Sequence, residues 1–299
     1  GKNEWADESD FIDTYKSTLN NMHFTSPSAE SFYSDFENFI TAQGEPISSI
    51  GPYAQYKVME LAKGNVTVTL DGQGADEQLA GYHYFFGSYF KELLTSFKLF
   101  RFFKEVIYYI TKHKSFTAIK YMIFYLLPNS IKRNLGGKIY GYINNDFAKK
   151  WEKVSTLGED LYNPKSLNES LIDHFEYKLE HLLKWDDLNA MNFSIESRVP
   201  FLDHNLVEAT LPIKPELKIN KAETKFILRE SVKDILPKEV YKRRDKKGFS
   251  TPSDDWFRTK DFKNYILQLL ESESFKKRGY FNVKKCKESY LKHLNKEIN

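Results

Sequence analysis

The pattern of hydrophobic and polar residues predicts helices with at least one short buried strand among them. Residues 52–63 carry apolar side chains at helical spacing and begin with a proline, which favours the first turn of a helix. Gly64 and Asn65 end this pattern, and the β-branched residues of 66–70 then predict a strand. A helix, a short break and a strand are typical of an α/β layer, so we expect 66–70 to belong to a parallel sheet.

Further helices are predicted over 168–193, 221–236 and 284–296, and in shorter pieces over 8–42. The segment 89–133 is also helical, but it is rich in aromatic residues and basic. It matches an amphipathic helix that binds a membrane surface or a partner. It also matches a core-packed helix pair with a solvated basic face, and the pattern favours this second interpretation. The fold class is therefore a helix-rich α/β structure.

Composition and charge exclude several classes of protein. In the 299 residues, 44 basic and 41 acidic side chains nearly cancel, which argues against a nucleic-acid-binding face. The apolar stretch 121–131 is short and contains Pro128, so no membrane span is expected. The single cysteine, Cys286, cannot form an intrachain disulfide or a cysteine-rich zinc site. With a polar, acidic beginning that does not resemble a signal peptide, the sequence predicts a cytoplasmic location.

The loop that follows the predicted strand carries the first candidate chemistry. Gly72 and Gly74 leave backbone N–H groups open to a ligand, and the carboxyl end of a parallel strand is where α/β sheets bind ligands. Asp76 and Glu77 come next, at the start of a helix. They either stabilise the helix end or hold Mg²⁺ together with substrate phosphates.

Three other stretches carry charge in unusual patterns. Glu196 and Arg198 lie in 194–203, where they suit either a site or an ion pair that braces a turn. Lys225 and Arg229 stand four apart on a predicted helix, an arrangement of two cations that a nearby anion would explain. Five of the six residues 242–247 are Lys or Arg, which predicts either a loop that closes over phosphates or a solvated basic turn.

Together these stretches resemble the synthetase domain of the glutamine-dependent, class B asparagine synthetases. The matching motifs are D-G-Q-G-A-D-E with G-Y at 71–82, E-S-R-V-P-F-L-D-H at 196–204, K-x-x-x-R at 225–229, the basic Gly-Phe loop at 243–252, W-F-R at 256–258 and R-G-Y-F-N at 278–282. The resemblance implies an ATP-pyrophosphatase sheet that is incomplete on its N-terminal side. It also implies one partial synthetase domain over 1–299, with a nucleotide-binding part at 1–88, a helical part at 89–195 and a C-terminal part at 196–299.

The resemblance also implies a reaction and a set of roles. A carboxylate, with aspartate as the first choice, attacks the α-phosphate of ATP, and ammonia then displaces AMP to form an amide. ATP and Mg²⁺ are the implied cofactors, and a homodimer is compatible with the resemblance. The implied residues are Lys225 and Gln73 for catalysis, Asp71, Gly72, Gly74, Lys246, Lys247 and Arg229 for ATP, Glu196, Arg198 and Asp187 for the substrate, and Asp76 and Glu77 for the metal.

Some features of the family pattern are missing or altered. No S-G-G-x-D-S loop for pyrophosphate occurs, and the first residue is glycine rather than the nucleophilic cysteine of a glutaminase. We therefore expect a carboxy-terminal fragment that is inactive alone and receives ammonia from an N-terminal or separate glutaminase domain. Gln73, Leu188 and Ala190 depart from the residues usual in the family, which favours another acceptor such as a surface-polysaccharide sugar acid. A non-catalytic scaffold that binds a partner is the remaining alternative.

Overall fold

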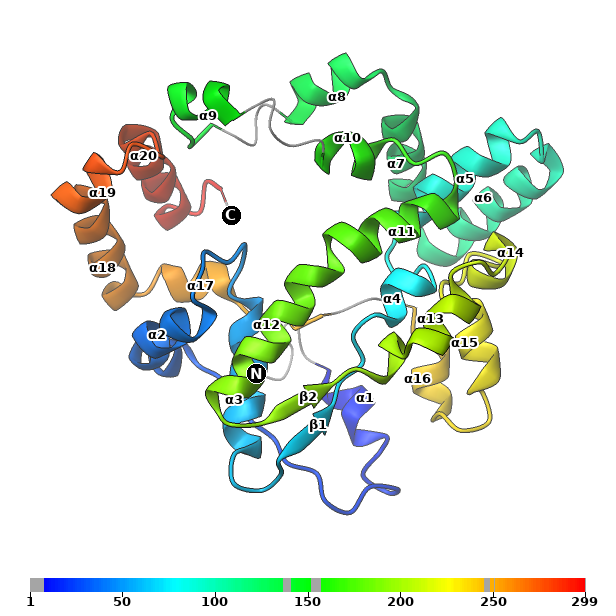
Figure 1. Cartoon of the computed structure of the whole chain (residues 1–299), viewed down its shortest axis with the longest axis horizontal. Helices are drawn as coiled ribbons and strands as arrows, with labels where there is room; N and C mark the ends of the chain where they lie inside the picture. Colours follow the sequence, from blue (N-terminus) through cyan, green and yellow to red (C-terminus); the bar gives the residue numbers. More distant parts are fainter. Residues whose placement is uncertain (1–7, 137–140, 152–156, 245–247, 250, 299) are drawn as a thin grey trace.

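The computed structural model describes residues 8–136, 141–151, 157–244, 248–249 and 251–298. These residues form a helix-rich α/β structure with a small parallel sheet, as the sequence predicts (Figure 1). In Figure 1 the helices α18 to α20 lie on the left and α5 to α8 on the right, and α12 and the two strands lie between these groups. No helix within the described residues is long and apolar enough to span a bilayer.

The N-terminal part contains three helices and the first strand: α1 (Ser9–Asp13), α2 (Ala29–Gln43), α3 (Gly51–Ala62) and β1 (Val68–Leu70). Ser28 caps α2 by accepting a hydrogen bond from the Ser31 amide, and Gly44 ends the same helix in the left-handed conformation. Pro52 stands in the first turn of α3, so the helix predicted over 52–63 is confirmed within one residue at each end.

The sheet consists of β1 and β2 (Glu196–Arg198), which pair in parallel with Val68 opposite Glu196 and Leu70 opposite Arg198. The Asp71 amide extends this ladder by donating to the Arg198 carbonyl at 2.7 Å. The prediction of a parallel strand within 66–70 is confirmed. The sequence analysis missed β2, since Glu196 and Arg198 are both exposed and the strand has no hydrophobic residue to mark it.

Between the strands the chain forms a helical group around α5, which packs against α6 and α7. Its buried aromatic residues, including Phe85, Phe86, Tyr89 and Phe90, form the first hydrophobic core with Tyr109 of α6. The helices in this part of the chain are α4 (Ala75–Gln78), α5 (Phe85–Thr95), α6 (Leu99–His113), α7 (Thr117–Leu126), α8 (Asn129–Gly136), α9 (Asn145–Trp151) and α10 (Leu157–Tyr162).

The helix predicted over 168–193 is two helices, α11 (Leu167–Tyr177) and α12 (Leu179–Asn192). Lys178 interrupts them with a backbone φ of −110°. Its ammonium group lies 4.7 Å from the centre of the Tyr84 ring, and the buried His174 stacks on that ring. The prediction of one continuous helix was wrong because contacts with Tyr84, distant in sequence, fix this break.

The C-terminal part packs α17 and α18 against α2 and α3 to form a second core. Phe32, Phe39, Tyr53, Trp256 and Phe262 are its largest rings. Its elements are η1 (Pro200–Leu202), α13 (His204–Thr210), α14 (Pro215–Lys218), α15 (Phe226–Ser231), α16 (Lys238–Lys242), α17 (Ser253–Phe257), α18 (Lys260–Glu271), α19 (Glu273–Lys277) and α20 (Val283–Leu294).

Of the helices predicted in this part, the one over 284–296 is confirmed as α20. The one over 221–236 is mostly wrong, since only α15 is an α-helix there. Lys221, Ala222 and Lys225 have left-handed backbone conformations with φ between 48° and 55°, which no continuous right-handed helix accommodates.

Candidate active site

A cavity of about 980 Å³ opens at the carboxyl end of β1. The loop from Asp71 to Gly74 forms one part of its wall, and Asp76, Glu77 and Tyr82 continue that wall. The remaining walls come from α1 and residues 25–27, from α3, from Leu182 and Trp185 of α12, and from the C-terminal part. The C-terminal residues that line the cavity are Gly248, Phe249, Thr251, Pro252 and Trp256. Six of the residues proposed from sequence therefore meet at one cavity: Asp71, Gly72, Gln73, Gly74, Asp76 and Glu77.

Two glycines allow the close packing of this loop. Gly74 has a φ of +91° at the first residue before α4, and a β-carbon there would collide with the Leu202 side chain. At Gly81 a β-carbon would collide with the carboxylate of Asp76. The two glycines thus fix the course of the backbone around Asp76, and Gly81 leaves room for its side chain.

Asp76 forms an ion pair with Lys225, with 2.8 Å between Oδ1 and Nζ. Lys225 is held in place by its own backbone, whose amide donates to the Leu79 carbonyl at 3.0 Å just after α4. Its φ of +51° is unusual for a residue with a side chain, and such conformations persist where the surrounding structure holds them. Lys225 is therefore a fixed cation that pairs with Asp76, and Asp76 lines the cavity.

Glu77 is buried, with 2% of its surface exposed, and its carboxylate accepts a hydrogen bond of 2.7 Å from the Tyr82 hydroxyl. Burial, and next the negative charge of Glu77, raise the pKa of Tyr82, so the hydroxyl stays protonated and continues to donate. Within the described ranges no three acidic, histidine or cysteine side chains are grouped to hold a metal ion. A cation at this wall would thus need oxygen atoms from a substrate in addition to Asp76, a mode that suits Mg²⁺.

The carboxyl groups of Asp71 and Asp186 are bridged by the side-chain amide of Gln55. Gln55 of α3 donates both to Asp71, at 3.2 Å, and to Asp186 of α12, while the Ser197 hydroxyl donates to the other Asp186 oxygen at 2.5 Å. Burial raises the pKa of Asp186 to about 6, and the neighbouring Asp71 adds to this rise. The end of β1, the middle of β2 and the helices α3 and α12 are therefore linked through the carboxyl group of Asp186 and the amide of Gln55.

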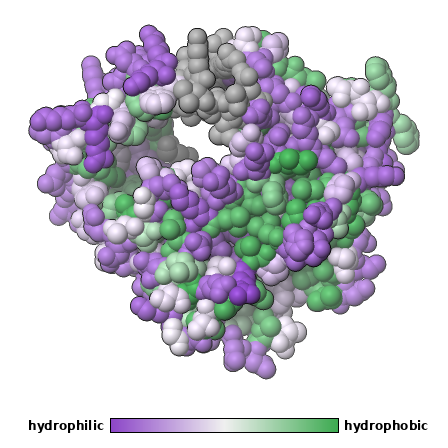
Figure 2. Space-filling view, in the orientation of Figure 1, coloured by the Kyte–Doolittle hydropathy of each residue, from purple (hydrophilic) through white to green (hydrophobic). Residues whose placement is uncertain are grey.

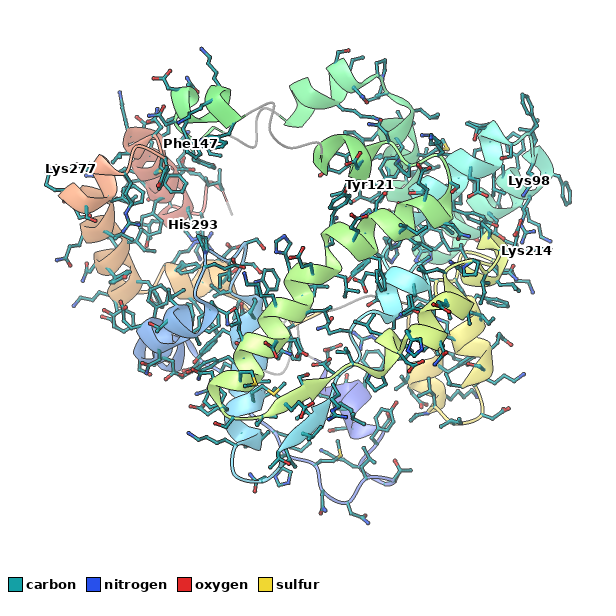
Figure 3. All side chains as sticks on the ribbon, viewed as in Figure 1. Lys98, Tyr121, Phe147, Lys214, Lys277 and His293 are labelled. Atoms are coloured by element: carbon teal, nitrogen blue, oxygen red, sulfur yellow. The ribbon has the colours of Figure 1, made fainter. Side chains whose placement is uncertain are left out.

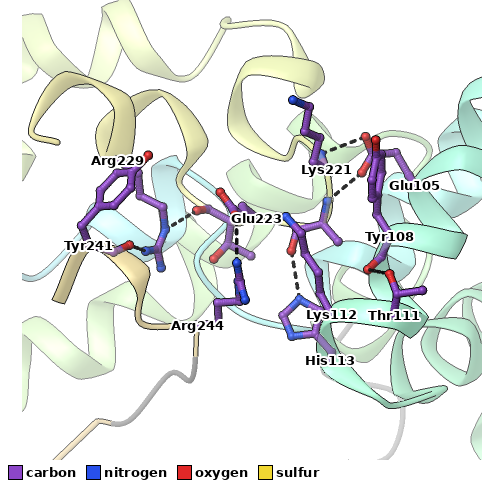
Figure 4. Close-up of polar contacts among 12 residues, drawn as sticks. Glu105, Tyr108, Thr111, Lys112, His113, Lys221, Glu223, Arg229, Tyr241 and Arg244 are labelled. Carbon is purple, nitrogen blue, oxygen red and sulfur yellow. Dashed lines mark hydrogen bonds and ion pairs between the residues drawn. The ribbon is translucent and has the colours of Figure 1, made fainter. Parts of the chain in front are cut away.

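The turn that carries Lys225 is braced by α6 (Figure 4). The buried carboxylate of Glu105 accepts hydrogen bonds from the Lys221 and Ala222 amides, at 3.0 and 2.9 Å. Nε2 of His113, also on α6, donates to the Ala222 carbonyl at 2.9 Å. Three hydrogen bonds from one helix thus stabilise the left-handed backbone of Lys221 and Ala222.

The side chain of Glu223 connects the same turn to two cations. Lys112 of α6 lies 2.9 Å from its carboxylate and Arg244 lies 3.3 Å from it. Burial alone would raise the pKa of Glu223, but the hydrogen bonds and charges of Lys112 and Arg244 outweigh it and hold the pKa below its usual range. Arg244 directly precedes the basic stretch that contains Lys246 and Lys247, and these two lysines lie outside the described residues.

The other residues proposed from sequence lie away from the cavity lining. Arg229 donates to the carbonyls of Thr224 and Tyr241, at 3.0 and 2.9 Å, and so joins the beginning of α15 to the end of α16. Glu196 and Arg198 pair with each other on the exposed face of β2 at 2.9 Å. Asp187 is exposed on α12. Their roles toward ATP or a substrate stay predictions.

Sequence reasoning missed Gln55 and Asp186. In the W-D-D stretch it selected Asp187, although Asp186 is the residue that turns inward. The helical period gives the signal, because Leu179, Leu182, Asp186 and Asn189 follow one another at spacings of three and four and share a face of α12. Gln55 has no comparable signal, since only the packing of α3 against α12 brings it to Asp186.

The site thus contains a glycine loop at the end of β1, the carboxylate of Asp76 paired with Lys225, and a cavity large enough for a nucleotide-sized ligand. Comparison with protein families finds that the asparagine synthase family model matches residues 4–298. The chain belongs to the asparagine synthase family.

Proteins similar to this chain cover most of it at low identity. "Asparagine synthetase [glutamine-hydrolyzing] 1" of Bacillus subtilis is 28% identical over 291 residues, covering 82% of this chain and 43% of that protein. "Amidase chyE" of Penicillium rubens is 23% identical and covers 92% of this chain and 46% of the relative. The asparagine synthetase of Cricetulus griseus is 27% identical over 62% of this chain and 34% of its own length. The chain thus spans less than half the length of these relatives.

Proposed function

We propose that this chain carries the ATP-dependent, amide-forming half of an asparagine synthetase-type ligase. A substrate carboxylate oxygen forms a bond to the α-phosphorus of ATP, and pyrophosphate leaves. The nitrogen of ammonia then forms a bond to the acyl carbon, AMP leaves, and the amide releases a proton. The observation that carries the proposal is that the 71–74 loop and Asp76 line one cavity, while Lys225 pairs with Asp76 from outside the cavity lining, in a member of the asparagine synthase family.

Lys225 is the residue proposed to stabilise the transition state of adenylation. The first step brings two anions together, so a positioned cation contributes most where negative charge develops on the α-phosphate. Its ion pair with Asp76 and its fixed backbone hold the ammonium group before any ligand binds. The N–H group of Gly74 would contact the nucleotide, and Gln73 would lie near the acyl carbonyl. The N–H group of Gly72 already donates to the Asp71 carboxylate at 2.6 Å, so Gly72 would contribute the close approach of its backbone to the nucleotide.

Mg²⁺ is proposed as the cofactor at Asp76, with Glu77 supporting the helix behind it. When bound, the ion would supply a positive charge that offsets the charge of the phosphates. Asp76 fits this role because its carboxylate lines the cavity at the beginning of α4. Lys246 and Lys247 are proposed to close over the phosphates, and their neighbours Gly248 and Phe249 line the cavity.

Aspartate is the first candidate for the carboxylate substrate, because the relatives that match the chain include enzymes named asparagine synthetase. A sugar acid is the second, on the strength of Gln73, Leu188 and Ala190. Ammonia is proposed to come from glutamine in a separate domain or protein, since several relatives are named glutamine-hydrolysing.

The direct test is exchange of labelled pyrophosphate into ATP, because only an adenylating enzyme makes this exchange depend on a carboxylic acid. It is run with the full-length natural protein that contains residues 1–299 and with the chain alone, first with aspartate and then with uronic acids. We expect pyrophosphate exchange that requires one of these acids. Once ammonia is added, we expect AMP as the product. Accumulation of ADP, or no acid-dependent exchange with the full-length protein, would refute the proposal and favour a non-catalytic role.

A further inference from the structure

Helix α6 presents a row of large apolar side chains to solvent. Phe100, Phe103 and Ile107 follow at spacings of three and four on one side of the helix, and Phe97 precedes them in the α5–α6 turn. The exposed fraction is 85% for Phe100, 59% for Phe103, 60% for Ile107 and 86% for Phe97. We call these four residues the aromatic face of α6. Figure 1 places α6 at the right-hand edge of the molecule, and hydrophobic atoms are visible at that edge in Figure 2.

The opposite side of α6 faces the protein, so packing alone does not account for the aromatic face. Glu105 and Tyr109 are buried there, against the Lys221–Ala222 turn and the first core. One side of the helix therefore packs on the core, as the sequence pattern favours. The side that faces solvent also carries apolar residues. Few soluble helices are apolar on the side that faces water, and such exposed apolar rows mark binding surfaces.

The charged side chains that α6 and its flanking residues present beside this face are cations. Lys104 and Lys114 have no ion-pair partner in the described part of the chain, while Lys98 and Arg101 share Glu216 at 3.5 Å. Lys98 lies at the outer edge of the molecule in Figure 3. The segment 91–133 has two carboxylates, and both turn inward. Glu105 accepts a hydrogen bond from the Ala222 amide of the Lys221–Ala222 turn, and Glu92 accepts one of 2.7 Å from the Leu167 amide. The segment thus offers only cations to a partner.

We propose that the aromatic face of α6 docks on the surface of an anionic phospholipid bilayer, with the helix lying in the plane of the interface. Phenylalanine side chains between flexible lysines are typical of helices that insert one face among lipid headgroups. A protein partner is less suited, because lysine is depleted in protein–protein interfaces. Each lysine near an anionic leaflet adds to the attraction, and the phenylalanines supply the apolar contact.

The test is flotation of the purified 299-residue chain with phospholipid vesicles. One set contains phosphatidylcholine and phosphatidylglycerol in equal amounts, and the other contains phosphatidylcholine alone. We expect the chain to float with the anionic vesicles, to float much less with the neutral ones, and to dissociate as salt is raised. Analytical ultracentrifugation without lipid measures whether the same face instead joins two copies of the chain.

Three variants separate the contributions. Phe100→Ser with Phe103→Ser should lower the vesicle partition coefficient by roughly tenfold or more per side chain. Lys104→Glu with Lys114→Glu should lower it by about fivefold for each lysine removed, and further through repulsion. Ile235→Ser, at a residue 79% exposed elsewhere on the surface, is the matched control and should leave partitioning unchanged. Circular dichroism verifies that all three variants fold.

Flotation that needs anionic lipid and is lost in both double variants supports the proposal. Failure to float with anionic vesicles overturns it, and so does equal flotation with neutral ones. A dimer abolished by the two serine substitutions overturns it as well, since the face would then be occupied by a second copy.

Discussion

At the scale of single residues, Lys225 is the position where conformation and charge are fixed together. Its ammonium group pairs with Asp76, its amide bonds to Leu79, and its backbone lies in the left-handed region. A left-handed lysine costs free energy relative to an ordinary conformation. The contacts around the turn offset that cost and aim the side chain at the wall of the cavity.

Replacing Lys225 tests whether this arrangement serves catalysis. Lys225→Ala should slow acid-dependent pyrophosphate exchange by about 10²–10³-fold, the usual effect of losing one positioned donor at a developing charge. Its free energy of unfolding should also fall, by about 1–3 kcal/mol, because both side chains of this ion pair are largely buried and Asp76 would lose its cation. The exchange rate is therefore compared per folded molecule. Lys284→Ala, at an exposed lysine of α20, is the matched control and should change neither quantity. An exchange rate like that of the natural sequence would remove Lys225 from the site.

Asp186 gives a prediction about pH. Because its folded pKa of about 6 exceeds the ordinary 3.8, the folded state binds this proton more tightly than the unfolded chain does. Its contribution to stability is therefore largest below about pH 4 and is lost as pH rises through 6. In Asp186→Asn that dependence should disappear. The stability of the variant relative to the natural sequence should then improve by about 1–3 kcal/mol between pH 4 and pH 8.

The effect of Asp186 is measured as the difference in unfolding free energy between the natural sequence and Asp186→Asn. This is needed because buried histidines change stability with pH in the opposite direction. Burial lowers the pKa of His83 and of His113, and lowers that of His174 to about 4, so these groups destabilise the fold as pH falls below their unfolded values. Urea unfolding at several pH values for both proteins cancels the shared histidine effect. A difference that does not vary with pH would mean that Asp186 stays ionised throughout.

At the scale of elements, α6 stabilises the turn that positions Lys225. Glu105→Gln should destabilise the protein by about 1–3 kcal/mol, since one amide of the turn would then face an NH₂ group instead of an acceptor. It should also lower the maximal rate of pyrophosphate exchange without a matching change in KM for ATP. The reason is that a displaced turn misplaces Lys225. Urea unfolding and steady-state exchange measure the two effects.

Glu92→Gln is the control that separates stability from positioning. Glu92 lies on α5 and accepts one hydrogen bond, from the Leu167 amide at the beginning of α11, far along the chain from the Lys225 turn. Its loss should lower stability as well, but the exchange rate per folded molecule should remain that of the natural sequence. If both variants lost exchange equally, Glu105 would have only a structural role.

The elements that the sequence predicts well are those whose signals are local. Pro52 and the β-branched run of 66–70 fix α3 and β1, and the periodicity of 284–296 fixes α20. The elements that it predicts badly depend on distant contacts. Glu105 holds residues 221 and 222 out of a helix, and Tyr84 lies against the break at Lys178. The same division applies to the site, where the glycine loop is visible in the sequence but the link between Gln55 and Asp186 is not.

At the scale of the whole molecule, Phe32 shows how separate segments are joined beneath the cavity. Its ring contacts Tyr53 of α3 and stacks on Phe262 of α18, with centroid distances of 4.8 and 5.0 Å. It also lies 5.4 Å from the ring of Trp256, a residue of the cavity wall. Residues from both ends of the chain therefore depend on one buried aromatic cluster.

Phe32→Ala should destabilise the protein by about 3–5 kcal/mol, the usual cost of the cavity left by a fully buried phenylalanine. Phe100→Ala removes the same side chain from an exposed position and should change stability by less than about 0.5 kcal/mol. Thermal unfolding followed by circular dichroism compares the two. Similar losses in both variants would mean that the cluster around Phe32 is not a core.

The pairing of β1 with β2 has a consequence for how the protein folds. Two strands of three residues each must find one another across all the chain from α4 to α12, and closing so long a loop costs entropy before any contact repays it. Such short strands contribute few contacts to offset this cost, so we expect the helices between them to form first. The ladder, and with it the cavity at its end, would then be among the last parts to form. During synthesis on the ribosome the 71–74 loop would already be translated before residues 196–198 emerge.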